Sequence, residues 1–315
     1  MRPSNAEILG VILTLILTTG GVALGIFRGW SHAAQVSEEV RARRSDAWRE
    51  AGKLVIRLVD DLPAVASDDV WSEAPVRSVE VRPQVVTMPI LEDTTATVVE
   101  VQAVTDGRTI SWRLSWMDPV PDTATDSGRF TDAVALQFPV SRNASFMMGG
   151  RDQRVQILHW KGIWQRDVEE GFQDVQDLHP NYWADLYWFA EAGGLPRVPD
   201  SFRDERSHAW FPAMQAGNPF SQFDRAQPIE ELTAEGFGSL TSQPSSASWG
   251  SGAWADGRWT VVVSRPLRTD DSADYQFTRG MIGNVAIAVW QGGDGNGGGR
   301  KRYSEWIEFR VESIS

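Results

Sequence analysis

Two adjacent methionines are the side chains of this sequence best suited to hold a metal. Met147 and Met148 stand directly before Gly149 and Gly150. A thioether is a soft ligand that haem iron accepts, and paired glycines let a flat macrocycle approach the backbone. We place both methionines at the end of a strand, where neighbouring side chains point to opposite faces, so only one can face a given site. The alternative is that both fill gaps in a hydrophobic core.

Histidine is a second candidate ligand, because imidazole is the commonest ligand of haem iron. His159 shares one face of a predicted strand with Val155 and Ile157. We interpret it as a partly buried, hydrogen-bonded residue, with iron ligation as the alternative. The four histidines lack the HxH and HExxH spacings of zinc hydrolases; they are His32, His159, His179 and His208.

The chain has no cysteine. This excludes disulfides, cysteine-ligated zinc, iron–sulfur clusters ligated by this chain, thiol catalysis and covalent c-type haem attachment. A bound metal must therefore be held by histidine, methionine, lysine or carboxylates.

Other catalytic motifs fail on inspection. The glycine-rich run 292–299 (GGDGNGGG) lacks the GK[ST] of a phosphate-binding loop and does not lie between a strand and a helix. No GxSxG elbow is present. The acidic pairs Glu169/Glu170 and Glu230/Glu231 are sequence neighbours, whose side chains point apart on a strand, so neither pair resembles a glycosidase dyad.

Charge and composition narrow the possible partners. The formal net charge is −12, which argues against binding to nucleic acid. Tryptophan occurs 15 times and tyrosine 4 times, so large flat apolar side chains are unusually frequent. They are available for a core, a partner surface or a cofactor pocket.

Residues 54–315 have the pattern of a β-domain. Short β-branched or alternating runs are separated by Gly, Pro, Asp and Asn, which predicts an all-β, antiparallel β-sandwich with long loop insertions. The main insertion spans about 167–238 and is expected to be functional or to contact a partner. The predicted strands fall within residues 53–59, 76–86, 95–104, 109–116, 133–140, 154–160, 258–267, 285–290 and 304–314.

The N-terminus is expected to anchor the chain to a membrane. Residues 8–27 carry no charge, and 20 residues at about 1.5 Å each cross a hydrocarbon core of about 30 Å. We therefore assign 1–32 to a transmembrane anchor and 33–53 to a solvated helical connector. A cleaved signal peptide is the alternative, since Ser31, His32 and Ala33 offer small residues near a cleavage point. By the positive-inside rule, the arginines that follow the predicted span favour a cytoplasmic location for the β-domain.

Seven segments, taken in order, resemble one known domain. Together they are similar to the ethylbenzene dehydrogenase-related haem-b domain, the γ (cytochrome b) subunit of type II molybdoenzymes of the dimethyl sulfoxide reductase family. That group includes enzymes of the nitrate reductase, nitrite oxidoreductase and dimethylsulfide dehydrogenase types. The segments are 132–140, 146–150, 156–167, 174–187, 230–241, 250–267 and 285–311, with a looser start near Lys53.

The resemblance implies a β-sandwich that holds one non-covalent b-type haem between a methionine and a lysine. Carried over to this chain, Met148 is the methionine ligand, with Met147 as the fallback. Lys301, in the segment GGGRKRYS, is the lysine. Lysine ligates iron only as a neutral amine, so its site must be desolvated and its pKa lowered. Lys161 is the competing lysine.

The resemblance also implies neighbours for the cofactor. Arg300 and Arg302 are candidates to pair with the haem propionates, as guanidinium does with carboxylates. Several tryptophans are expected to line the pocket, among them Trp160 and Trp290.

The implied function is electron transfer without a catalytic site. The expected partners are a molybdopterin catalytic subunit, an iron–sulfur subunit and, further along the pathway, a c-type cytochrome or quinone. The resemblance implies an exported subunit. We therefore expect a membrane-anchored body on the periplasmic or extracytoplasmic side, although the distribution of arginines favours the cytoplasmic side. Two alternatives remain: an anchored carbohydrate-binding module with exposed tryptophan platforms, or a structural subunit without haem.

Overall fold

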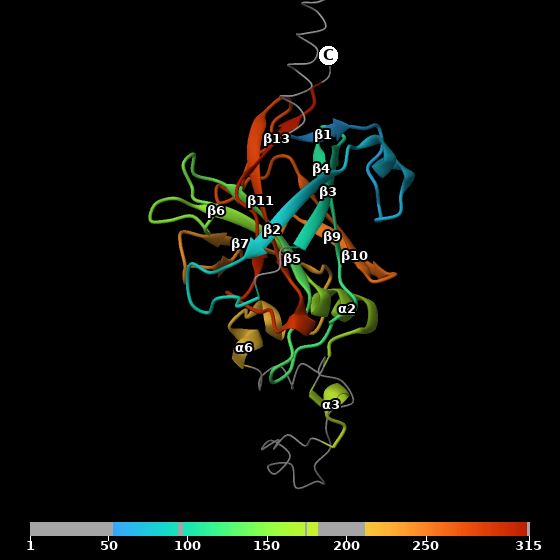
Figure 1. Ribbon diagram of the computed structural model, residues 1–315, viewed down its shortest axis with the longest axis vertical. Helices are drawn as coiled ribbons and strands as arrows, with labels where there is room; N and C mark the ends of the chain where they lie inside the picture. Colours follow the sequence, from blue (N-terminus) through green and yellow to red (C-terminus); the bar gives the residue numbers. More distant parts are fainter. Residues whose placement is uncertain (1–52, 94–96, 174, 182–211, 314–315) are drawn as a thin grey trace, which may run out of the picture. The chain divides into compact units, whose positions relative to one another are not determined.

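Segments of alternating hydrophobic residues form the strands of this chain (Figure 1). The computed structural model describes residues 53–93, 97–173, 175–181 and 212–313. The fold is all-β and mostly antiparallel, which confirms that part of the expectation. The strands are β1 Leu54–Leu58, β2 Arg77–Pro83, β3 Thr97–Thr105, β4 Thr109–Met117, β5 Ala133–Pro139, β6 Val155–Lys161, β7 Ile229–Ala234, β8 Thr241–Ser242, β9 Trp249–Ala255, β10 Arg258–Pro266, β11 Ile282–Trp290, β12 Arg302–Tyr303 and β13 Ile307–Val311.

The described helices are short and lie outside this sheet. They are η1 Asp69–Glu73, α2 Gly162–Glu170, α3 Val175–Leu178, α6 Pro212–Gln215, η2 Pro219–Ser221 and η3 Gly292–Asp294.

The strands pair along one path in the described residues, in the order β8-β7-β6-β5-β11-β12-β2-β3-β4-β10-β9. β1 runs parallel to both β13 and β3, off this path. β11 serves two layers: residues 282–285 pair with β13, and residues 286–290 pair with β5. The sheet thereby divides into a layer around β3, β4 and β10 and a layer around β5, β6 and β7.

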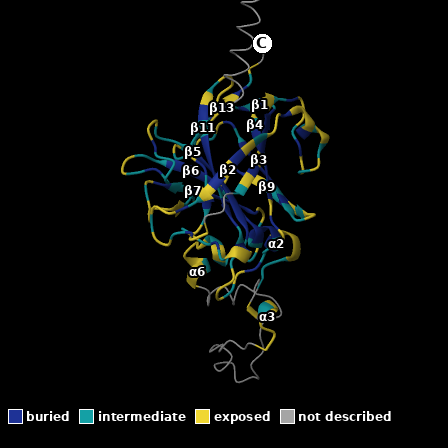
Figure 2. Ribbon diagram, in the orientation of Figure 1, coloured by how far each residue is buried: buried dark blue, intermediate teal, exposed yellow. Residues whose placement is uncertain are grey.

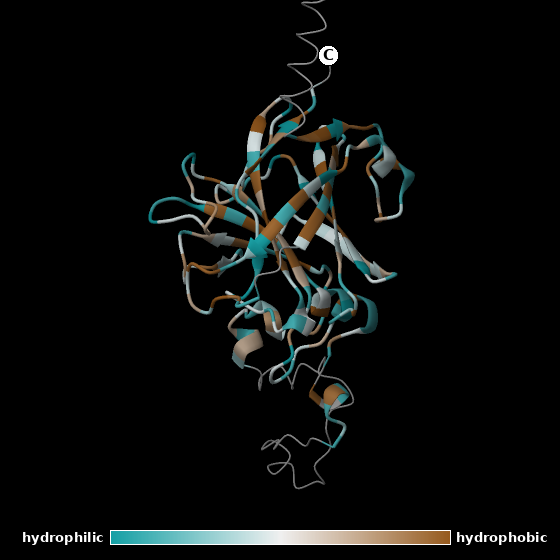
Figure 3. Ribbon diagram, in the orientation of Figure 1, coloured by the Kyte–Doolittle hydropathy of each residue, from teal (hydrophilic) through white to brown (hydrophobic). Residues whose placement is uncertain are grey.

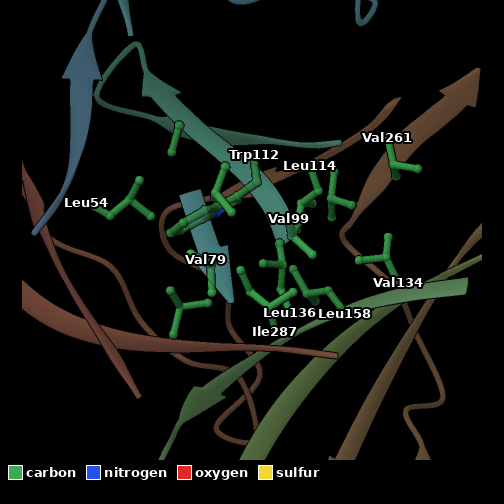
Figure 4. Packing of buried hydrophobic residues seen from close by; sticks show 14 of the residues in the cluster. Leu54, Val79, Val99, Trp112, Leu114, Val134, Leu136, Leu158, Val261 and Ile287 are labelled. Carbon is green, nitrogen blue, oxygen red and sulfur yellow. The ribbon is translucent and has the colours of Figure 1, made fainter. Parts of the chain in front are cut away.

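The main core lies between these two layers. Val134, Leu136 and Leu158 from one layer pack in the same cluster as Trp112 and Leu114 from the other (Figure 4). Figure 2 shows the buried residues gathered on the central strands. Aromatic rings fill the interior at close range; Trp116 and Trp160, for example, have ring centroids 6.3 Å apart in an edge-to-face arrangement. The tryptophan excess therefore serves the core to a large extent.

The strands also bury residues on their outer faces. Brown and teal segments alternate along strands such as β2 in Figure 3, as expected for a strand with one apolar face. β5 and β6, in contrast, each bury all but one of their seven residues. Their outer face carries a second apolar cluster that includes Ala133, Ala135 and Ile157. The small alanines leave room above this face, which becomes important for the site below.

Two expectations need correction. The insertion expected over 167–238 ends before Ile229, because β7 pairs with β6 in an antiparallel register. Glu230 and Glu231 hide this strand in the sequence, although both side chains are buried and hydrogen-bonded. Glu169 and Glu170 lie on α2 and not on a strand. The insertion residues 182–211 lie outside the described residues.

The N-terminal expectations are not addressed by the described residues. The proposed span 8–27 and the connector up to residue 52 both lie outside them. Within the part that is described, no helix has the length and apolar character needed to cross a membrane.

A buried carboxyl lies where β4 ends. Asp118 is 4% exposed, and it lies near Asp132, which is completely buried. Burial, and to a smaller extent the Asp132 charge, raises the pKa of Asp118 to about 7. Since the folded pKa exceeds the unfolded value of about 3.9, the native state retains a proton that the unfolded chain loses. Asp118 therefore contributes a loss of stability as pH rises from about 4 to about 7.

Replacing Asp118 by Asn should stabilise the protein over the native sequence, and it should do so more strongly at high pH than at low pH. The gain in melting temperature over the native sequence should be larger at pH 8 than at pH 5, because only the charged carboxylate is penalised by burial. Thermal unfolding at both pH values measures it. Asp60→Asn, at an exposed position, is the matched control. An equal gain at both pH values would contradict the assignment.

Candidate functional site

A cavity of about 510 Å³ lies over the outer face of β5, β6, β7 and β11. Its floor contains Ala133, Ile157, His159, Leu232 and Trp290, and loops within residues 84–89, 125–131, 237–240 and 296–299 complete the lining. This volume is within the range of small-molecule and cofactor sites, and the lining is predominantly apolar. The cavity is the place where the residues proposed from the sequence can be tested for proximity.

Strand alternation decides which residues of β6 reach the cavity. Ile157, His159 and Lys161 line it, whereas Leu158 and Trp160 point into the main core. Trp160 is completely buried and donates a hydrogen bond from Nε1 to Gln165 Oε1 at 3.2 Å. The structure therefore does not bring Trp160 to the site for which the sequence nominated it.

Met148 reaches the cavity from a turn between β5 and β6, not from the end of a strand as expected. Its φ is +64° and that of Gly149 is +75°, both in the left-handed region. This conformation is uncommon and costly for methionine, and strain of this kind clusters at functional sites. The turn is held by hydrogen bonds from Gly149 N to Ser145 O at 2.9 Å and from Gly236 N to Met148 O at 2.8 Å.

Met147, the fallback ligand, lies elsewhere. It lines a smaller neighbouring cavity of about 50 Å³, which Met148 also touches, but it does not line the large cavity. The turn, and not strand alternation, therefore separates the two methionines.

Lys301 contacts Met148 in the cavity. Its Nζ lies 3.7 Å from Met148 Sδ and 5.2 Å from the centroid of the Trp290 ring. Burial lowers the pKa of Lys301 to about 8. Within the described residues no carboxylate is paired with this amine. A neutral lysine amine is therefore more accessible here than on a solvated surface.

Gln84 holds the loop that carries Lys301. Its backbone N donates to Lys301 O at 2.9 Å, and its Nε2 donates to Gly299 O at 3.0 Å and Pro89 O at 3.2 Å. A side chain at Gly299 would place its Cβ 2.9 Å from Pro89 O. Gln84 is 2% exposed, so this clamp is well shielded from water. Sequence reasoning missed Gln84, since a lone glutamine in a loop has no distinctive signal.

Lys161, the competing lysine, also lines the cavity but is already paired. Its Nζ forms a buried ion pair with Glu230, whose other carboxylate oxygen accepts a hydrogen bond from Ser242. Lys161 also lies 3.6 Å from the centroid of Trp164. Burial lowers its pKa to about 8 even though Glu230 acts in the opposite direction. Of the two cavity lysines, Lys301 is thus the one that has no counter-ion among the described residues.

The two arginines proposed for propionates lie outside the cavity lining. Arg300 is exposed. Arg302 is 2% exposed and binds protein groups: its guanidinium pairs with Asp93 and donates to Asn296 Oδ1 at 3.3 Å and Gln291 Oε1 at 3.2 Å. Arg302 therefore braces the glycine-rich loop beside the site.

Trp290 and His159 form one wall together. Their rings lie 4.8 Å apart with planes inclined by 31°. Trp290 Nε1 donates to Gly298 O at 3.0 Å, which ties this wall to the glycine-rich loop. Of the six residues proposed to bind a cofactor, Met148, Lys301 and Trp290 meet in the large cavity, whereas Met147, Arg300 and Trp160 do not line it.

Comparison with known proteins adds a family. The sequence pattern of the family named ethylbenzene dehydrogenase matches residues 68–302. A protein of Haloferax mediterranei named as a respiratory nitrate reductase heme subunit, ORF7, is 26% identical over 255 residues, which are 80% of this chain and 70% of that protein. The dimethylsulfide dehydrogenase subunit gamma of Rhodovulum sulfidophilum is 28% identical over 202 residues, or 63% of this chain and 55% of that one.

Solved structures show a more distant likeness. A family 9 carbohydrate-binding module of Caldicellulosiruptor kristjanssonii, in complex with glucose, covers 84% of this chain and 97% of its own length with a TM-score of 0.37 and 8% identity. Similarity at this level supports no inference about a ligand.

Breaking the buried ion pair of Lys161 should destabilise the fold. Glu230→Gln leaves the lysine charge buried without a counter-ion, which costs about 3–5 kcal/mol in typical proteins. Urea denaturation measures the loss in the free energy of unfolding. Glu235→Gln, at the exposed pair with Arg154, is the control and should change it by less than about 1 kcal/mol. Equal effects of the two substitutions would contradict the prediction.

The turn that carries Met148 should not accept a side chain at Gly149. Gly149→Ala combines a left-handed φ, costing about 1–2 kcal/mol, with a Cβ only 2.1 Å from Gln153 O. Gly128→Ala has a similar φ of +74° but no atom within 4 Å of its Cβ. Denaturant titration should show a larger loss of stability for Gly149→Ala than for this control. A loss no larger than the control's would mean that the turn relaxes without strain.

Proposed function

This chain belongs to the ethylbenzene dehydrogenase family, and we propose that it is the haem-b electron-transfer subunit of a membrane-associated molybdenum oxidoreductase complex. The family membership confirms the resemblance noted in the sequence. The two named relatives are a heme subunit of a nitrate reductase and a gamma subunit of a dimethylsulfide dehydrogenase. Their names support a role in electron transfer, without a catalytic site in this chain.

The observation that carries the proposal is the facing pair of Met148 and Lys301. The two side chains would together hold one iron ion, the thioether of Met148 as a soft ligand and the neutral amine of Lys301 as the second. Lys301 Nζ and Met148 Sδ lie 3.7 Å apart, so the two candidate ligands already share one place in the cavity. A soft thioether and an uncompensated amine in an apolar cavity therefore suit a haem iron.

The protein's contribution is to hold these two ligands and keep water away. The left-handed turn aims Met148, and the clamp of Gln84 fixes the loop of Lys301. Desolvation favours the neutral amine that can bind a metal. When bound, the haem would supply a one-electron redox centre. Trp290 and the alanine floor would shield it on one side.

The wider assembly follows from the same proposal. An iron–sulfur subunit would exchange electrons with this chain, and a molybdopterin subunit would carry out catalysis. We place the body on the extracytoplasmic side, tethered through residues 8–27, with a c-type cytochrome or quinone as the external electron partner. The aromatic and proline-rich segment around 167–228 is the candidate docking region.

The carbohydrate-binding alternative finds little support in the described tryptophans. Of these, Trp249 is the only one more than a third exposed, at 41%. A sugar platform generally needs exposed aromatic faces, whereas most of these rings are in the core.

The proposal is tested by loading the full-length chain with haem and recording reduced-minus-oxidised visible spectra with a pyridine haemochrome assay. We expect a b-type spectrum at about one haem per chain. Met148→Ala and Lys301→Ala should each shift this spectrum and weaken haem retention by at least about tenfold, since each would remove a proposed iron ligand. The matched controls are Met147→Ala and Lys53→Ala; Lys53 pairs with Glu308 at the surface.

Two results would overturn this assignment. A folded native chain that stays colourless would refute haem binding and favour the structural subunit without haem. A b-type spectrum that survives both Met148→Ala and Lys301→Ala would retain the cofactor but reject the ligands.

A further inference from the structure

His159 is half-buried and carries a buried polar atom that the proposed ligation leaves unexplained. Its Nε2 is buried and has no hydrogen-bond partner within the part of the chain that the structure describes. Among the buried side-chain nitrogen and oxygen atoms of the described residues that lack a partner, it is the only one on a side chain lining the large cavity. A buried polar atom left without a hydrogen bond is costly, so such an atom calls for a functional explanation.

Burial favours the neutral form of the His159 imidazole. Burial lowers its pKa well below the usual range, and the charges of Lys161 and Lys301 lower it further. A neutral imidazole has one N–H donor and one nitrogen with a free lone pair, which accepts a hydrogen bond. This site therefore offers an acceptor as well as a donor.

The groups that could pair with this nitrogen are few. Lys161 is occupied by Glu230, and Glu230 also binds Ser242. Lys301 Nζ, in contrast, has the sulfur of Met148 and the face of Trp290 as neighbours, both weak acceptors. A neutral lysine amine still has two N–H groups to donate. His159 and Lys301 both line the cavity and both lie against the indole of Trp290.

We infer that His159 is a positioning residue of the proposed haem site, whose Nε2 accepts a hydrogen bond from the amine of Lys301 when that amine is bound to iron. This inference rests on the proposed function and deepens it. Groups that bind a metal ligand from behind orient it and raise its electron-donating strength. His159 would thus hold the lysine in its neutral, ligating form without touching iron itself.

The test compares three variants of the full-length chain loaded with haem. His159→Leu removes the acceptor, His159→Gln restores an acceptor oxygen near the position of Nε2, and Ile157→Leu perturbs the same floor without polar change. For His159→Leu we expect a reduction potential shifted to more positive values, because a weaker donor stabilises oxidised iron less. We also expect roughly 10–100-fold faster haem transfer to apomyoglobin. His159→Gln should recover most of both effects, and Ile157→Leu should resemble the native chain.

Nitrogen NMR of the histidine-labelled protein without haem provides an independent readout. The signals absent from His159→Gln identify this residue, and we expect a neutral ring at pH 7 with Nε2 unprotonated. A protonated ring, or a neutral ring that carries its hydrogen on Nε2, would overturn the inference.

The redox outcomes separate this inference from the proposed function. If the native chain binds haem through Met148 and Lys301 but His159→Leu keeps its potential and haem retention, His159 is a core residue and the inference alone fails. If His159→Gln behaves like His159→Leu, ring shape and not the acceptor is what counts. If His159→Leu loses the native b-type spectrum while Met148→Ala or Lys301→Ala keeps it, His159 is itself a ligand and the inference fails. If the native chain binds no haem, the proposed function fails and the role of His159 falls with it.

Discussion

The burial of strand β6 on both faces is the constraint on which the site depends. Leu158 and Trp160 of this strand fill the core between the two layers. The opposite face of β6 must therefore be covered by other parts of the chain. Loops from distant parts of the chain provide that cover and leave a cavity over the alanines of β5. Since the side chains of a strand alternate strictly, a shift of one residue in register would move His159 and Lys161 into the core.

The cavity distinguishes two lysines by their partners. Lys161 and Lys301 are both desolvated, and burial lowers the pKa of each to about 8. Glu230 neutralises Lys161 and makes it part of the framework, whereas Lys301 faces a thioether and an indole. A lysine ammonium without a counter-ion is unfavourable in such apolar surroundings. The cost falls when the amine loses its proton and becomes neutral. The same burial that would destabilise an empty site therefore favours metal binding.

Much of the fold could be predicted from the sequence, because apolar alternation is a local property. Nine expected segments coincide with strands, from β1 to β13. β7 was missed because its glutamates look solvent-exposed, and only the tertiary partners Lys161 and Ser248 explain their burial. Trp160 was misplaced for a related reason: tryptophan suits both a core and a pocket, and the face it occupies depends on strand register.

The sequence by itself determined the kinds of ligand available, since a chain without cysteine and with three lysines leaves few choices. It also determined the all-β class and carried the family resemblance. Only the tertiary structure decided which methionine lines the large cavity, and which of its two lysines contacts that methionine. The reason is that Met148 is aimed by a left-handed turn and Lys301 by a clamp from Gln84, residues separated from one another by long stretches of chain. Such contacts arise from packing and leave no periodic signal in the sequence.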